Sequence, residues 1–215
     1  MGAATKKTPK ETSEKAKKSN KIIAVSQYTK SLVASLKLKN IEVIPNGFKI
    51  PISLNVEKPK AFNSKKDPVL ITVGNVTDRK GQLNVIKVLP FLKENYPKIQ
   101  YHIVGIPTMK ETFKDVAFKL GVHSSIIFHG EVTEERKLQL LTESDIFVML
   151  SNKTNTGDVE GFGIAIIEAN ALGLPAIGSN TSGIVDAISD TFSGKLVEPK
   201  NGNTILNAVE EISNN

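Results

Sequence analysis

The sequence predicts an α/β fold with a doubly wound parallel sheet, and three observations support that prediction. After residue 67, short apolar runs alternate with longer amphipathic segments. The short runs are apolar throughout, which is typical of parallel strands that are buried on both faces. Strand and helix also alternate at the spacing of βαβ units, and such units build a doubly wound sheet.

The predicted elements follow in order along the chain. Ahead of the sheet, the letters KIIAVS indicate a short buried strand, YTKSLVASLKL one amphipathic helix, and IEVIPNGF a strand that ends in a Pro-Asn-Gly turn. The predicted strands of the sheet are Val69–Val73, Gln100–Val104, Ile126–Phe128, Asp145–Leu150 and Pro175–Gly178. The predicted helices are Gly81–Asn95, Met109–Leu120, Thr133–Ser144, Gly163–Leu172 and Asn203–Ile212.

The charge is concentrated at the start of the chain. The 215 residues carry a formal net charge of +6, and residues 1–20, with six Lys and two Glu, account for +4 of it. These residues are almost free of apolar side chains, so we expect a basic disordered tail. Residues 49–67 show no steady period and indicate a linker. The predicted organisation is thus a tail over 1–20, a small unit over 21–48, a linker, and the sheet domain over 68–215.

The composition disfavours several functional classes. Because the chain has no Cys, disulfides, thiolate catalysis and Cys-ligated zinc are excluded. The three histidines, His102, His123 and His129, do not stand at the spacing of a zinc site. The sequence has no run of ~20 apolar residues and no signal-peptide pattern, so we expect a cytoplasmic protein. Nucleic acid is a poor partner, since the residues after the tail are close to neutral.

The segment EGFGIAIIEANALGLP, residues 160–175, is the strongest candidate for a site. Ligands of parallel sheets bind beyond the carboxyl ends of the strands, and this segment joins a loop at that edge to a helix. The helix start after Gly161, Phe162 and Gly163 offers free N–H groups and the positive end of the helix dipole to an anion such as a diphosphate. Glu168 suits a pair of hydroxyls such as a ribose diol. Glu160 suits a hexose, or positive charge on its ring.

A second candidate segment is VGNVTDRKGQ, residues 73–82. It places Arg79 and Lys80 at the predicted start of a helix. Two cations there oppose the helix dipole, and they become favourable when an anion binds beside them.

Together these segments resemble a known family. VGNVTDRKG, FHGEV and DVEGFGIAIIEANALGLPAIGS are similar to the donor-binding half of retaining GT-B glycosyltransferases of family 4. KIIAVSQYTK and VIPNGF resemble the end of the acceptor half and the crossover of that family, so the likeness covers residues 20–212. It implies a Rossmann-like sheet, the C-terminal half of a GT-B fold, over 68–215. It also implies that 21–48 are a remnant of the acceptor domain.

The resemblance implies a nucleotide-diphosphate sugar as donor, transfer with retention, and neither metal nor other cofactor. Lys80 corresponds to the diphosphate-binding Lys, and Glu168 to the ribose-binding residue. Glu160, the candidate catalytic residue, holds the donor sugar with the backbone of Gly161–Gly163. The further donor-binding candidates are Gly74, Asn75, Arg79, Gly130, Val132, Phe162, Thr181 and Gly183. Asn75 replaces an Arg of the family, for which Arg79 is a candidate substitute.

The resemblance leaves alternatives open. An acceptor domain is missing before Lys21, so this polypeptide is expected to bind donor and to transfer little. The alternative is a non-catalytic nucleotide-sugar-binding subunit that completes an enzyme with a separate acceptor-domain chain. An acceptor at a membrane surface is a further expectation, with the chain peripheral to the inner face. A dinucleotide-dependent oxidoreductase is disfavoured, because GNVTDRKG lacks the Gly-x-Gly-x-x-Gly pattern. His129 is a weak candidate for contact with the base, and Ser182 is predicted to be a helix N-cap.

Overall fold

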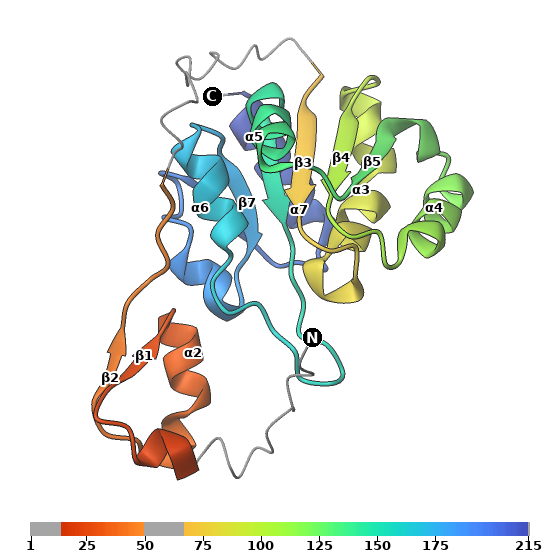
Figure 1. Cartoon of the computed structure of the whole chain (residues 1–215). Coiled ribbons are helices and arrows are strands. Elements are labelled where there is room, and N and C mark those ends of the chain that lie inside the picture. Colours follow the sequence, from red (N-terminus) through yellow and green to blue (C-terminus); the bar gives the residue numbers. More distant parts are fainter. Residues whose placement is uncertain (1–13, 50–66, 215) are drawn as a thin grey trace.

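The main part of the molecule is a six-stranded parallel sheet with helices on both faces (Figure 1). The structure is a computed structural model that describes residues 14–49 and 67–214. The strands are β3 (Val69–Val73), β4 (Gln100–Val104), β5 (Ile126–Gly130), β6 (Ile146–Met149), β7 (Ala176–Ser179) and β8 (Gly194–Val197). Their order is β5-β4-β3-β6-β7-β8, which reverses direction between β3 and β6. In doubly wound sheets the crevice at such a reversal is the usual ligand site.

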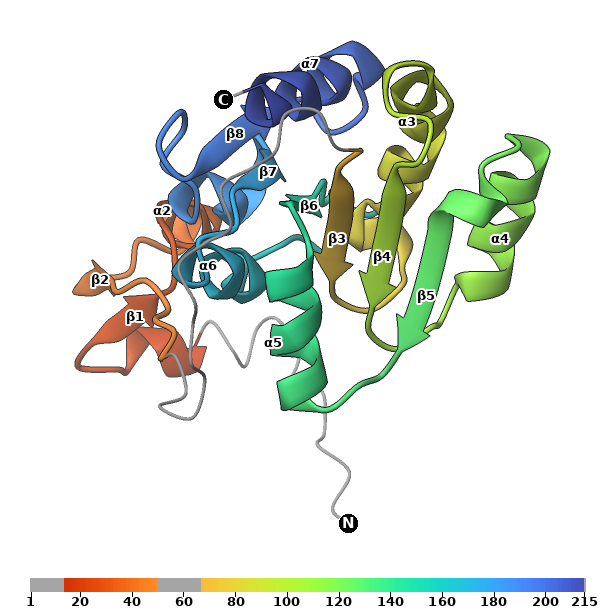
Figure 2. The same ribbon diagram turned by 90° about the horizontal axis from the view of Figure 1, so that it is seen from above.

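Helices cover the two faces of the sheet in separate groups, as Figure 2 shows. One face packs against α3 (Gln82–Asn95), α4 (Lys110–Lys119) and α7 (Gly202–Ser213). The other packs against α5 (Glu134–Glu143), α6 (Ile164–Ala171) and the 3-10 helix η4 (Ser182–Asp186). Neighbouring residues of β3 serve the two cores, Leu70 the first and Ile71 the second. The predicted doubly wound parallel sheet is confirmed.

The predicted helices of the sheet domain agree with the observed ones to within one residue at each end. Local signals explain this agreement. The Thr133 hydroxyl accepts a hydrogen bond from the Arg136 N–H ahead of α5, and the Asn201 side chain accepts two at the start of α7. Strand β5 runs two residues further than predicted and includes His129 and Gly130.

Two features at the end of the sheet differ from prediction. Strand β8 was not predicted, because GKLV holds two apolar residues and owes its conformation to pairing with β7. The predicted N-cap Ser182 is wrong: it is the first residue of η4, with a φ of 64°, and Thr181 occupies the cap position.

Residues 20–49 form a small unit beside the sheet domain (Figure 1). Strands β1 (Ile22–Ala24) and β2 (Ile41–Val43) pair in parallel, and α2 (Gln27–Leu32) and a short 3-10 helix, η1 (Ala34–Leu36), connect them. The prediction of one helix over 28–38 is wrong, since α2 ends at the C-cap Val33 and Lys37 adopts a φ of 48°. Thr29, Ser31 and Val33 all have low helix propensity, which favours the early end.

Two further expectations for this unit are also wrong. Strand β1 was predicted to be buried, but Ala24 is its one buried residue, and Ile23 is 61% exposed. Residues 44–49 form no turn.

The first 20 residues and the linker lie largely outside the described residues, which exclude 1–13 and 50–66. Residues 14–17 form a helical turn, whereas the sequence predicted disorder for them. Among the helices of the described ranges, none is long and apolar enough to cross a membrane.

Candidate functional site

The loops after β3, β4 and β5 are tied side by side at the carboxyl edge of the sheet. The Gly74 N–H donates to the Val104 carbonyl at 2.8 Å, and the Gly105 N–H donates to the Gly130 carbonyl at 2.8 Å. A Cβ on Gly105 would lie 2.4 Å from the Gly74 oxygen. Glycine is therefore required where these loops meet, and the edge offers backbone at close range to a ligand.

Arg79 and Lys80 follow β3 in a short 3-10 helix, η2 (Asp78–Lys80), and α3 begins after it. Gly81, with a φ of 75°, separates the two helices. The aliphatic part of Lys80 lies against Gly74, where a Cβ would come within 3.1 Å of the Lys80 Cε. This contact holds the Lys80 side chain against the loop that follows β3.

Glu160 holds both of these cations. Its Oε2 atom lies 2.6 Å from Arg79 Nη1 and 2.6 Å from Lys80 Nζ. The Arg79 Nε atom also pairs with Asp158 Oδ2 at 3.0 Å. The Glu160 side chain is 13% exposed. Burial opposes its ionisation, but Lys80 and then Arg79 hold the pKa of this carboxyl below its ordinary value. The structure thus unites residues that the sequence placed in two separate segments.

The Glu160–Gly161 turn is fixed through its backbone. The Glu160 carbonyl accepts a hydrogen bond from the Gly183 N–H at 3.0 Å, and a Cβ on Gly183 would lie 1.9 Å from the Gly161 oxygen. The Gly183 N–H thus supports the turn in this structure, and contact of Gly183 with a donor stays a prediction. The Phe162 side chain is buried in the core beside α6. Of Phe162, only the backbone remains for a ligand.

Helix α6 begins after Gly163, which has a φ of 100°, and no side chain caps its first turn. Glu168, on the same helix, pairs with Lys137 of α5 at 3.0 Å, and both side chains are about one-seventh exposed. Lys137 also contacts Glu134 at 2.9 Å. Burial opposes the charge of Lys137, yet Glu134 and Glu168 together raise its pKa. A largely buried carboxylate needs a hydrogen-bonding or charged partner, and Lys137 is that partner for Glu168 in this structure.

The remaining predicted residues contribute mainly backbone. Asn75 is exposed, and its carbonyl accepts from Gln82 Nε2 at 3.0 Å. Gly130 adopts a φ of 71° at the end of β5, and Val132 packs partly against the α5–α6 core. Thr181 is exposed and makes no side-chain cap to η4.

His102 and His129 lie together on the sheet, with ring centroids 5.0 Å apart. Burial lowers the pKa of both imidazoles. The neighbouring His129 lowers the pKa of His102 further, and the charge of Arg136 lowers that of His129. His129 lies within β5 rather than in the loop after it. Within residues 14–49 and 67–214, no three His, Asp or Glu side chains are grouped as metal ligands.

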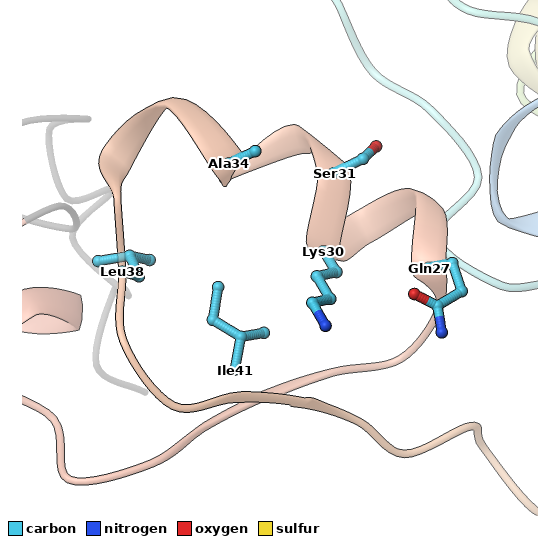
Figure 3. A pocket seen from close by; sticks show the side chains of 6 residues that line it. All are labelled: Gln27, Lys30, Ser31, Ala34, Leu38 and Ile41. Atoms are coloured by element: carbon cyan, nitrogen blue, oxygen red, sulfur yellow. The ribbon is translucent and has the colours of Figure 1, made fainter.

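A cavity of about 370 Å³ lies elsewhere, between α2 and β2 (Figure 3). It is lined by Gln27, Lys30, Ser31, Ala34, Leu38 and Ile41. Figure 3 shows Ile41 pointing toward the helix. This cavity contains none of the predicted site residues, so it is separate from the ion pairs at the carboxyl edge.

Sequence reasoning missed three side chains of the carboxyl edge: Lys137, Asp158 and Ser26. Asp158 stands two residues before Glu160 in a polar loop, a signal that was available. Lys137 follows Glu134 by three residues, which marks a helical ion pair but not its contact with α6. Ser26 has no such signal, because its contact spans 135 positions of sequence.

The family model for "Glycosyl transferases group 1" matches residues 55–215. A GDP-mannose-dependent α-(1-6)-phosphatidylinositol monomannoside mannosyltransferase from Mycobacterium tuberculosis is 28% identical over 196 residues, 87% of this chain and 51% of that protein. The amylovoran biosynthesis glycosyltransferase AmsK from Erwinia amylovora is 30% identical over 145 residues, 65% of this chain and 36% of that protein. The chain spans about half or less of the length of these relatives.

Solved structures share the fold. A TarM mutant from S. aureus, in complex with fondaparinux, α-GlcNAc-glycerol and UDP, superimposes with a TM-score of 0.79 at 21% identity. That match covers 96% of this chain and 39% of TarM. HepE from Anabaena, in complex with UDP and glucose, gives a TM-score of 0.76 at 19% identity, over 94% of this chain and 56% of HepE. The arrangement of strands and helices described above is thus shared with parts of both structures.

Proposed function

Because the chain belongs to the group 1 glycosyl transferases, we propose that it binds a nucleotide-diphosphate sugar at the carboxyl edge of its sheet. The observation that carries the proposal is the convergence of Arg79 and Lys80 on one carboxylate oxygen of Glu160. Two cations at the reversal between β3 and β6 suit a diphosphate. In the absence of a ligand, Glu160 and Asp158 balance their charge.

The diphosphate competes with Glu160 for the two cations. Lys80 and Arg79 then pair with phosphate oxygens, and the uncapped first turn of α6 after Gly163 adds free N–H groups and the helix dipole. Glu160 is released toward the sugar, where a carboxylate accepts hydrogen bonds from sugar hydroxyls. This exchange joins the two segments in one binding event.

The nucleoside end of the donor is assigned to Glu168. Its carboxylate accepts hydrogen bonds from the two ribose hydroxyls, while the contact with Lys137 holds it in place. The backbone of Gly130 and Val132 lines the base, and Thr181 borders the opposite side. The bases named among the similar proteins differ, since one relative depends on GDP-mannose and TarM was solved with UDP. We leave the base to experiment.

The proposed reaction is glycosyl transfer with retention and without a metal ion. The bond between the anomeric carbon and the diphosphate oxygen breaks, an acceptor hydroxyl forms the new glycosidic bond, and its proton passes to the departing diphosphate. Lys80, Arg79 and the start of α6 stabilise the negative charge of the leaving group. Glu160 stabilises the positive charge that develops on the sugar ring. The acceptor site belongs to a further domain, so this chain alone transfers little.

A second candidate function is that of a nucleotide-sugar-binding subunit whose acceptor domain is a separate chain. The exposed apolar side chains of the 20–49 unit favour it: Ile23 is 61%, Leu32 53% and Ile44 46% exposed. An acceptor presented at a membrane surface suits either version. The two versions differ in one measurement, because a separate acceptor-domain chain restores transfer only in the second.

The proposal is tested by thermal unfolding with UDP, GDP and ADP and their sugar conjugates. A ligand at 100 times its dissociation constant is expected to raise the unfolding midpoint by roughly 5–10 °C. Lys80→Met and Glu168→Ala are expected to abolish that shift. The matched control is Lys195→Met, which removes a cation paired with Glu211 near the amino end of β8. No shift with any nucleotide, or equal loss in the control, contradicts the proposal.

A further inference from the structure

We propose that Ser26 is a positioning residue that holds the Glu160–Gly161 turn in the geometry needed to bind the donor sugar. Ser26 lies in the 20–49 unit, outside the sheet domain. The proposal rests on the proposed function for its consequence, and on hydrogen bonds of the described residues for its geometry.

The Ser26 hydroxyl is fixed on both of its sides. Ser26 is fully buried, and its Oγ donates to the Gly161 carbonyl at 2.7 Å while accepting from the Thr29 N–H at 2.9 Å. The Thr29 Oγ1 atom, which donates to the Ser26 carbonyl and accepts from the Ser26 N–H, is a second acceptor for the Ser26 hydroxyl at 3.0 Å. The Gly161 carbonyl is the closer of the two acceptors, at 2.7 Å, and so takes the one proton of Ser26 Oγ.

The turn is held by its two successive carbonyls. Gly161 bonds to Ser26, and Glu160 bonds to the Gly183 N–H. Both partners come from distant parts of the sequence, so the turn owes this backbone geometry to tertiary contacts. The Glu160 carboxylate, in turn, reaches Arg79 and Lys80.

A second contact anchors α2 to the same region. The Gln27 N–H donates to Asp186 Oδ2 at 3.1 Å, and Asp186 ends η4, the helix that contains Gly183. Methyl groups of Thr29 and Val25 lie 3.7 and 3.8 Å from where a Gly161 Cβ would stand. Figure 1 shows α2 below the sheet domain on the side of this contact. The 20–49 unit thus contacts both the Glu160–Gly161 turn and η4.

The consequence is selective. A turn freed from Ser26 changes the position of Glu160, which is assigned to the sugar. The nucleoside contacts of Glu168 and Lys137 come from α6 and α5 and do not depend on Ser26. Loss of the Ser26 hydroxyl is therefore expected to reduce the affinity gained from the sugar, while the affinity for the nucleotide diphosphate changes little.

The test compares Ser26→Ala with Thr29→Val in the full chain. Both changes disturb the capping box of α2, but only the first removes the hydrogen bond to Gly161. Amide hydrogen exchange of Gly183, whose N–H donates to the Glu160 carbonyl of this turn, is measured first, without ligand. Ser26→Ala is expected to accelerate it by about 10-fold, the value of one net hydrogen bond, and Thr29→Val by less than about 2-fold.

The second measurement is calorimetric. It gives the dissociation constants of each variant for the nucleotide sugar and for its nucleotide diphosphate. Ser26→Ala is expected to lower the ratio of the two affinities about 5- to 10-fold, and Thr29→Val to leave it unchanged. Equal ratios in the two variants, or unchanged exchange at Gly183, overturn the proposal. If the unaltered chain binds no nucleotide, the proposed function fails and the donor role of Ser26 fails with it. The exchange result then still decides whether Ser26 holds the turn.

Discussion

Glu160 concentrates the electrostatics of the site on one oxygen atom. Two cations lie 2.6 Å from that atom, in a place where the carboxylate is largely shielded from water. Charge-assisted hydrogen bonds of this kind are the strong ones, and shielding strengthens them further. The same contacts hold Arg79 and Lys80 in place, so the positions of two cations are fixed without a ligand.

The lowered pKa of Glu160 makes a prediction about stability and pH. Because the folded-state pKa lies below the ordinary 4.5, the stabilisation is fully present above pH 4.5 and is lost as the pH falls through the folded-state value. Urea unfolding of the unaltered chain and of Glu160→Gln should therefore differ most at neutral pH. The difference should shrink below pH 4.5, and a constant difference down to pH 3 would be the contrary result.

Prediction from sequence reached some site residues and not others. Arg79, Lys80 and Glu160 were proposed because their charges stand beside glycines at predicted helix starts, and Glu168 because it is a carboxylate inside an apolar helix. The structure shows their ion pairs, and their contacts with a donor stay predictions. The partnership of Glu168 with Lys137 was not found, since it depends on how α5 packs against α6. Gly183 was expected to touch the donor, whereas its N–H is taken by Glu160. Packing between elements decided both cases.

At the scale of elements, η4 and the Glu160–Gly161 turn meet in one of the tightest backbone contacts of the site. Gly183→Ala would place a Cβ 1.9 Å from the Gly161 oxygen, which is backbone and cannot swing aside. We expect a loss of about 1–3 kcal/mol in the free energy of unfolding. Gly47→Ala, where a Cβ meets nothing within 4 Å, should change it by less than about 0.5 kcal/mol. Equal values in urea unfolding would refute this close contact.

The elements themselves were largely predictable. Apolar strands and amphipathic helices alternate clearly in the sheet domain, and the helices carry local caps such as Thr133. The misses have different causes, because β8 lacks a periodic apolar pattern, whereas the amphipathic pattern of residues 28–38 continues past the end of α2. Strand β8 is stabilised by β7, and the first turn of α2 is tied to η4 through Gln27 and Asp186. Neither contact can be predicted from one segment of sequence alone.

At the scale of the whole molecule, the chain combines a complete doubly wound sheet with a small unit that shares its site. The two-stranded sheet of that unit is too small to be stable alone, and its contacts through Ser26 and Gln27 explain its place. The matched relatives are about twice as long or more.

The proposed donor site lies at the carboxyl edge of the sheet. Amide hydrogen exchange with and without the tightest-binding nucleotide sugar measures directly where the donor binds. We expect protection in residues 74–81, 130–137 and 160–168, around the Glu160 and Glu168 ion pairs. The cavity between α2 and β2 serves as the internal comparison and should show no protection at residues 30–41. Protection confined to that cavity, or binding that leaves residues 74–81 and 160–168 unprotected, would contradict the account.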